Sequence, residues 1–62
     1  MDAFERALQF VTIGDYESAN SEYGLIIDLE PDNSAAWYGM GVVEHARGDI
    51  SAAINAFERA FC

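Results

Sequence analysis

Apolar residues recur along this chain at the spacing of four amphipathic helices. Positions three or four apart lie on one face of a helix, so each run of such positions predicts one helix. The runs cover residues 2–13, Tyr16 to Leu29, Ser34 to Arg47, and Ile50 to Phe61. Because no strand is predicted between them, the expected fold class is all-α.

Turn-forming residues separate the predicted helices. Gly14-Asp15 and Gly48-Asp49 each join a glycine that can end a helix in the left-handed conformation to an aspartate that can cap the next helix. Links this short make the flanking helices antiparallel. Pro31 cannot continue a helix that runs into it, and residues 32–34 supply side-chain oxygens that can cap the third helix.

The apolar positions also predict which faces are buried. The expected buried faces comprise Tyr16, Ala19, Tyr23, Ile26 and Ile27 in the second helix, and Ala53, Ile54, Phe57 and Ala60 in the fourth. Glu22 is expected to point outward. Gly24 lies in mid-helix, where glycine costs about 1 kcal/mol against alanine, so we expect a close backbone contact there.

The second half of the chain repeats the pattern of the first. An offset of 34 residues, which we call the repeat period, aligns Gly14-Asp15 with Gly48-Asp49 and Tyr23 with Phe57. Paired antiparallel helices with a 34-residue period are the signature of one class of repeat protein. The offset between the two halves of this chain matches that period.

The chain resembles the tetratricopeptide repeat (TPR) family over its whole length, as two consecutive units, residues 1–33 and 34–62. The matching positions are Trp37, Met40, Gly41, Gly48, Ala53, Phe57 and Ala60 in the second unit, and Ala7, Phe10, Gly14, Tyr16, Ala19, Tyr23 and Pro31 in the first. Ala3, Arg6, Ile26 and Glu44 depart from the family motif. The resemblance implies a single domain, residues 1–62, of two helix-turn-helix repeats stacked as a short right-handed α-solenoid. The second repeat is expected to lack a capping helix.

The negative net charge of the chain argues against two classes of binding partner. The net charge is −8, with three arginines and no lysine. Nucleic acids and anionic membranes are therefore not expected as partners, because both are bound through clustered basic side chains. No apolar stretch approaches the roughly 20 residues of a membrane span, and no basic segment followed by an apolar run indicates a leader. The expected location is the cytoplasm.

No pattern of residues indicates an active site. His45 is the only histidine and Cys62 the only cysteine, so neither a disulfide within the chain nor a metal-binding motif is predicted. The acidic residues lack the spacing of a calcium loop. We therefore expect no catalytic residue, no metal and no cofactor, and the protein is not expected to be an enzyme.

The TPR resemblance implies a concave surface formed by the first helix of each unit. The residues carried onto it are Phe4, Leu8, Val11 and Thr12 from the first unit, and Ala35, Tyr38, Val42, His45 and Ala46 from the second. Only His45 among them could be basic, which disfavours the binding of a peptide carboxylate. The expected function is a non-catalytic protein–protein interaction module that binds a partner helix or peptide through this apolar face. The candidate binding residues are Phe4, Leu8, Val11, Thr12, Tyr38, Val42 and His45.

Self-assembly is the alternative function. Repeat arrays need polar terminal caps, yet Ile54, Phe57 and Phe61 lie near an uncovered C-terminal end. A homo-oligomer could form through these residues and through the concave face. The sequence does not separate this hypothesis from the binding of a foreign partner, and a third hypothesis is a fragment of a longer repeat array.

Overall fold

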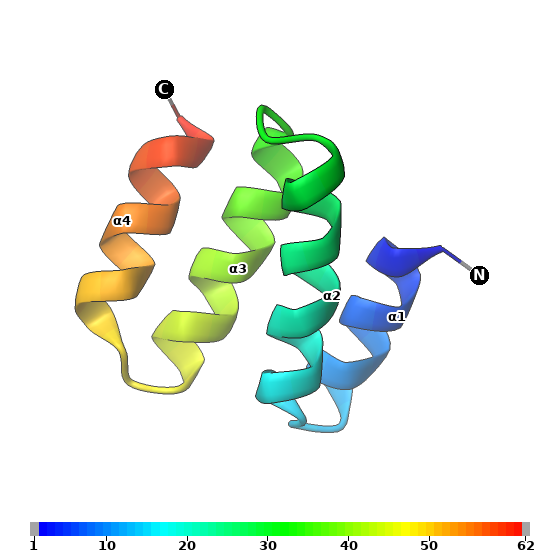
Figure 1. Ribbon diagram of the computed structural model, residues 1–62. Helices are drawn as coiled ribbons and strands as arrows, with labels where there is room; N and C mark the ends of the chain where they lie inside the picture. Colours follow the sequence, from blue (N-terminus) through cyan, green and yellow to red (C-terminus); the bar gives the residue numbers. More distant parts are fainter. Residues whose placement is uncertain (1, 62) are drawn as a thin grey trace.

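Four helices form the part of the protein that the computed structural model describes, residues 2–61, and no strand occurs there. The helices are α1 (Ala3–Thr12), α2 (Tyr16–Leu29), α3 (Ser34–Ala46) and α4 (Ile50–Ala60). Each helix packs against the next in chain order (Figure 1). The all-α prediction is confirmed, and each predicted helix end lies within one residue of the observed one.

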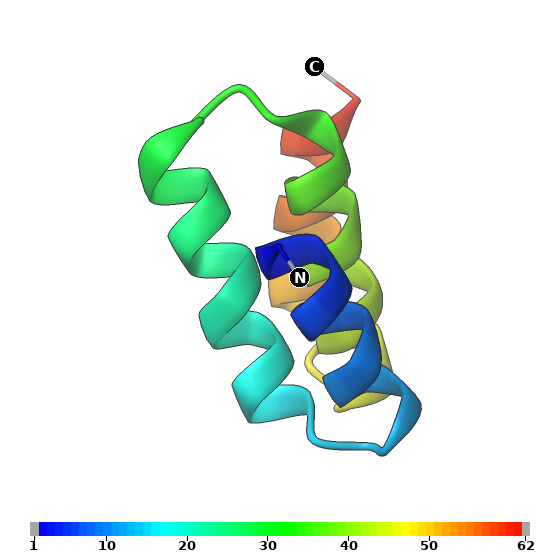
Figure 2. The ribbon, with the colours of Figure 1, turned by 90° about the vertical axis from the view of Figure 1, so that its right-hand side faces the viewer.

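The helices form two antiparallel hairpins, α1 with α2 and α3 with α4, which are joined by packing of α2 against α3. The view turned by 90° places α2 to one side of α1 and α3 (Figure 2). The first helices of the two hairpins therefore lie on the same side of α2.

The tight loops within the two hairpins share one conformation. Gly14 and Gly48 have φ angles of +81° and +85°, the left-handed region that favours glycine. The N–H of Gly14 donates to the carbonyl of Val11, and the N–H of Gly48 to that of His45, each at 3.0 Å. Equivalent glycines, one repeat period apart, thus end α1 and α3 in the same way.

A capping side chain precedes every helix. Asp2, Asp15, Asn33 and Asp49 each accept a hydrogen bond from the backbone N–H three residues further along. These bonds satisfy N–H groups that have no partner within the helix. The predicted caps at Asp15 and Asp49 are confirmed, and among residues 32–34 it is Asn33 that caps α3.

Small side chains dominate the buried interior. The buried apolar residues are Ala7, Ala19, Tyr23, Ile26, Ala36, Val43, Ala53, Ala56 and Ala60. Alanine lets two helices approach closely but contributes little apolar area. The hydrophobic contribution to stability is therefore modest in a chain of this length.

Two glycines of α3 lie against aromatic rings of the neighbouring helices. A Cβ atom at Gly39 would lie 2.5 Å from Cζ of Tyr23, and one at Gly41 would lie 2.7 Å from Cε1 of Phe57. Gly24 has nothing within 4 Å of the equivalent point, so the close contact predicted there is wrong. The close contacts occur where α3 meets an aromatic side chain of α2 or α4.

Two predictions about buried faces are also wrong. Ile54 is 54% exposed, because it lies on the side of α4 that no other helix covers, and Ala56 is buried instead. Glu22 does not point freely into solvent: its side chain is only 13% exposed and accepts a 2.6 Å charged hydrogen bond from Nε of Arg6. This ion pair links α2 to α1.

Trp37 links the turn between the hairpins to the last helix. Its indole N–H donates to the carbonyl of Pro31 at 2.9 Å. The guanidinium carbon of Arg59 lies 5.0 Å from the centre of the indole ring, within the range of a cation–π interaction. Trp37 therefore contacts both the α2–α3 turn and α4.

Two glycine-to-alanine substitutions should have opposite effects on stability. Gly41→Ala places a methyl group against the ring of Phe57, and we expect the overpacking to lower the free energy of unfolding by about 1–3 kcal/mol. Gly24→Ala is the matched control, since it adds the same methyl group in open space within a helix, and should raise that free energy by about 0.5–1 kcal/mol. Urea unfolding followed by circular dichroism measures both. Equal changes in the two variants would contradict the close contact at Gly41.

Candidate functional site: an apolar groove between α1 and α3

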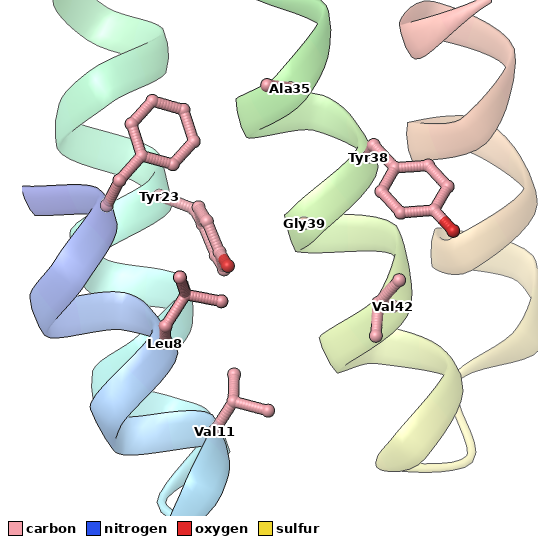
Figure 3. A pocket seen from close by; sticks show the side chains of 8 residues that line it. Leu8, Val11, Tyr23, Ala35, Tyr38, Gly39 and Val42 are labelled. Atoms are coloured by element: carbon pink, nitrogen blue, oxygen red, sulfur yellow. The ribbon is translucent and has the colours of Figure 1, made fainter.

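An open groove of about 280 Å³ lies between α1 and α3, with α2 beneath it. Its lining is almost wholly apolar and consists of Phe4, Leu8, Val11, Tyr23, Ala35, Tyr38, Gly39 and Val42 (Figure 3). No charged side chain belongs to this lining.

The two walls of the groove come from equivalent helices. Leu8 and Val11, three residues apart, lie on one face of α1, and Tyr38 and Val42, four apart, lie on one face of α3. Figure 3 shows Leu8 and Val11 pointing from α1 into the space between the two helices. Leu8 is 57% exposed, and Tyr38 and Val42 are also exposed, so the walls offer apolar surface to solvent.

Tyr23 of α2 forms the floor of the groove. Its ring is buried against Gly39 of α3 and makes an edge contact with Phe4 of α1, with 6.1 Å between the ring centres. Burial raises the pKa of the Tyr23 hydroxyl above its ordinary value. In Figure 3 this hydroxyl points toward the space between α1 and α3. The Tyr23 side chain of α2 thus contacts both walls and sets the distance between them.

The structure brings five of the candidate binding residues together. Phe4, Leu8, Val11, Tyr38 and Val42 all line the groove. Two other candidates lie outside this lining. The hydroxyl of Thr12 donates to the carbonyl of Leu8 within α1 at 2.9 Å, and His45 is exposed in the last turn of α3.

The sequence did not identify Tyr23 and Gly39 as groove residues. Tyr23 had the pattern of a core position, and Gly39 is one of several small residues in the third helix. The only available signal was a large and a small residue on neighbouring helices. Spacing along one helix does not tell which residues of two helices meet.

A second apolar surface follows α4 and contains all three residues predicted for the C-terminal end. We name this surface the α4 stripe; its members are Ile50, Ile54, Phe57 and Phe61. Ile50 and Ile54 are about half exposed, and Phe61 is 76% exposed. The rings of Phe57 and Phe61 have their centres 5.6 and 6.2 Å from that of Tyr38, so the stripe adjoins one wall of the groove. Ile50 was missing from the sequence prediction.

Ionisable groups do not gather into a site within residues 2–61. No set of three or more histidine, cysteine, aspartate or glutamate side chains is placed there to hold a metal ion. Glu44 has a raised pKa, mainly because burial removes water from its carboxylate and secondly because Asp49 is nearby. None of the four helices combines the length and apolarity needed to cross a membrane.

Comparison of the chain with models of protein families, with curated protein sequences and with solved structures gave no match.

Neutralising Glu44 should stabilise the protein at neutral pH. A pKa raised by folding means that the charged carboxylate is less favourable in the folded state than in the unfolded one. The contribution of Glu44 to stability is thus complete below its unfolded pKa and is lost as the pH rises through its folded pKa. Glu44→Gln should raise the urea midpoint at pH 7 and leave it nearly unchanged at pH 3.5.

The control for this experiment is Glu58→Gln, which removes one negative charge from an exposed position in α4. Its effect at pH 7 should be smaller than that of Glu44→Gln. If both variants unfold at the same urea midpoint, general relief of the −8 charge accounts for the effect and burial of Glu44 does not.

Proposed function

We propose that the protein is a non-catalytic binding module that holds an amphipathic helix of a partner protein in the groove between α1 and α3. The observation that carries the proposal is the exposure of apolar walls, above all Leu8, Tyr38 and Val42, on both sides of one open groove. Contiguous apolar surface rimmed by polar residues is typical of interaction sites. The only ionisable side chains in the groove lining are those of Tyr23 and Tyr38.

A helical partner fits the shape and chemistry of the groove. Helices that bind in apolar grooves do so through side chains at positions i, i+3 or i+4, and i+7. Because the walls are themselves helices, their backbone groups are already hydrogen-bonded and offer no sheet edge to an extended peptide. The polar atoms in the lining are chiefly tyrosine hydroxyls, so specificity would come from the size and order of the apolar anchors.

Charge favours a basic partner. The net charge of −8 creates an attractive potential for lysine and arginine side chains around a groove that is itself uncharged. Covering roughly 300 Å² of apolar surface would contribute about 7–8 kcal/mol before the cost of association, which is several kcal/mol. We therefore expect this contact area alone to bind a short helix weakly, with a dissociation constant on the order of 1 mM.

We further propose that the two hairpins are TPR units. The proposal is supported by residues at motif positions, such as Trp37, Gly41 and Ala53, and by the recurrence of the same glycine turn and aspartate cap after one repeat period. In this interpretation, the groove is the concave side of the shortest stack of two units.

Substitution of the walls should abolish peptide binding. The probe is a fluorescein-labelled 14-residue peptide of leucine and lysine, with leucine at helical spacing, and binding is measured by fluorescence anisotropy. Leu8→Glu and Val42→Glu should each weaken binding at least tenfold, because they bring a charge into the apolar contact. Both side chains are exposed in the free protein, so helicity should be retained.

Two controls separate apolar docking from charge attraction. Gln9→Glu makes the same one-unit charge change as Leu8→Glu on an exposed position next to it, outside the groove lining, and should bind the peptide at least as tightly as the wild type. A scrambled peptide of equal composition, without helical spacing, should bind weakly. Undiminished binding by both groove variants would refute the groove as the docking site.

A further inference from the structure

The α4 stripe occupies positions that are covered in the first hairpin. Shifting Ile50, Ile54, Phe57 and Phe61 back by one repeat period gives Tyr16, Asn20, Tyr23 and Ile27 of α2. Those four residues are buried or half-buried, because α2 packs between α1 and α3. On α4 only Phe57 is half-buried, and the other three are exposed. Phe57 and Phe61 contact α3, but no helix of this chain covers the outer side of the stripe, where Ile50, Ile54 and Phe61 are exposed.

The N-terminal end of a second copy cannot cover the stripe favourably. The face of α3 that lies toward α2 includes Ala36, Gly39 and Val43. The equivalent positions of the first hairpin, found by the same shift of one repeat period, are Asp2, Glu5 and Gln9, and all are exposed. Stacking copies end to end would bury these polar groups against apolar side chains, which is costly without hydrogen-bond partners. Open-ended assembly is disfavoured on this ground.

We propose that the α4 stripe pairs with the α4 stripe of a second copy about a two-fold axis. Its members are spaced four, three and four residues apart. This is the spacing of the apolar residues that form the contact between two helices in a coiled coil. In the antiparallel arrangement, Ile50 of one copy meets Phe61 of the other, and Ile54 meets Phe57. Every layer then combines one isoleucine with one phenylalanine, and the helix dipoles are opposed. A two-fold contact of this kind closes on itself.

Charge is consistent with a second copy at this surface. Between Ile50 and Phe61 the only charged residues are Glu58 and Arg59, so α4 is neutral in a chain of net charge −8. By contrast, α2 carries Glu17, Glu22 and Asp28 and no basic residue. Repulsion between two copies is therefore smaller when they meet through α4 than when they meet through α2.

The area of the α4 stripe determines how strongly the dimer is expected to associate. Four side chains per copy cover on the order of 400 Å², or about 800 Å² for both copies, which is below the size of a standard stable interface. We therefore expect a weak dimer that forms at tens of micromolar or above, as is typical of small transient contacts. None of the four stripe residues lines the groove, and the stripe meets the groove only where Phe57 and Phe61 contact Tyr38. This inference therefore does not depend on the proposed function.

Sedimentation equilibrium from about 5 to 500 µM, with reductant present, tests the dimer. The apparent mass of the wild type should rise from 6.8 kDa toward twice that value and no further. Ile54→Glu and Ile50→Glu should each remain monomeric over the whole range. Asn55→Glu, an equal charge change at the exposed position next to Ile54 but off the stripe, should dimerise like the wild type within about threefold. Circular dichroism confirms that each variant is folded.

Three outcomes with the wild type and the stripe variants would overturn the proposal. They are a wild type that is monomeric at 500 µM, a mass that grows beyond the dimer, and dimerisation that persists in both stripe variants. The groove variant Leu8→Glu separates the two proposals, since it should lose peptide binding and still dimerise. Loss of dimerisation in Leu8→Glu alone would assign the self-contact to the groove instead.

Disulfide trapping tests the orientation of the two helices. In a Cys62→Ser background, Ile50→Cys and Phe61→Cys are prepared as separate chains, both at exposed positions. Antiparallel pairing predicts that the mixed chains form a disulfide between the two variants, whereas neither variant alone forms one efficiently. Efficient disulfide formation by each variant with itself would show a parallel pair and overturn the antiparallel arrangement.

Discussion

The close approach of helices at small residues is the constraint on which the rest of this structure depends. Tyr23 and Phe57 lie against Gly39 and Gly41, and alanines fill most of the remaining buried positions. A core of this kind has little room for further large apolar side chains. Leu8, Tyr38, Ile54 and Phe61 therefore remain at the surface in a chain that is 52% hydrophobic, and the exposed apolar surfaces follow directly from how the interior is packed.

The groove depends on the same contact. Tyr23 reaches from α2 to Phe4 on α1 and to Gly39 on α3, so one ring sets the distance between the two walls. Because α1 and α3 belong to different hairpins, the shape of the groove reports how the hairpins pack on each other. The two ends of the stack differ in kind: α1 presents charged and polar side chains outward, whereas α4 presents isoleucine and phenylalanine.

Local features of the fold could be predicted because each depends on residues close in sequence. Helix ends, the left-handed glycines and the aspartate caps need only one turn of chain to be specified. Gly24, Glu22 and Ile54 were misjudged because their surroundings depend on which helix lies across from them. The same distinction holds in the site: Leu8 and Val42 follow from periodicity within a helix, while the place of Tyr23 in the floor follows only from the angle between helices.

Trp37 gives the molecule a built-in optical reporter. It is the only tryptophan, and its indole touches the carbonyl of Pro31 in the inter-hairpin turn and the guanidinium of Arg59 on α4. Opening of the turn and detachment of α4 each remove one of these neighbours, and both change the polarity around the same ring. Fluorescence of a single residue therefore follows the integrity of the second hairpin and its junction with the first, without any added label.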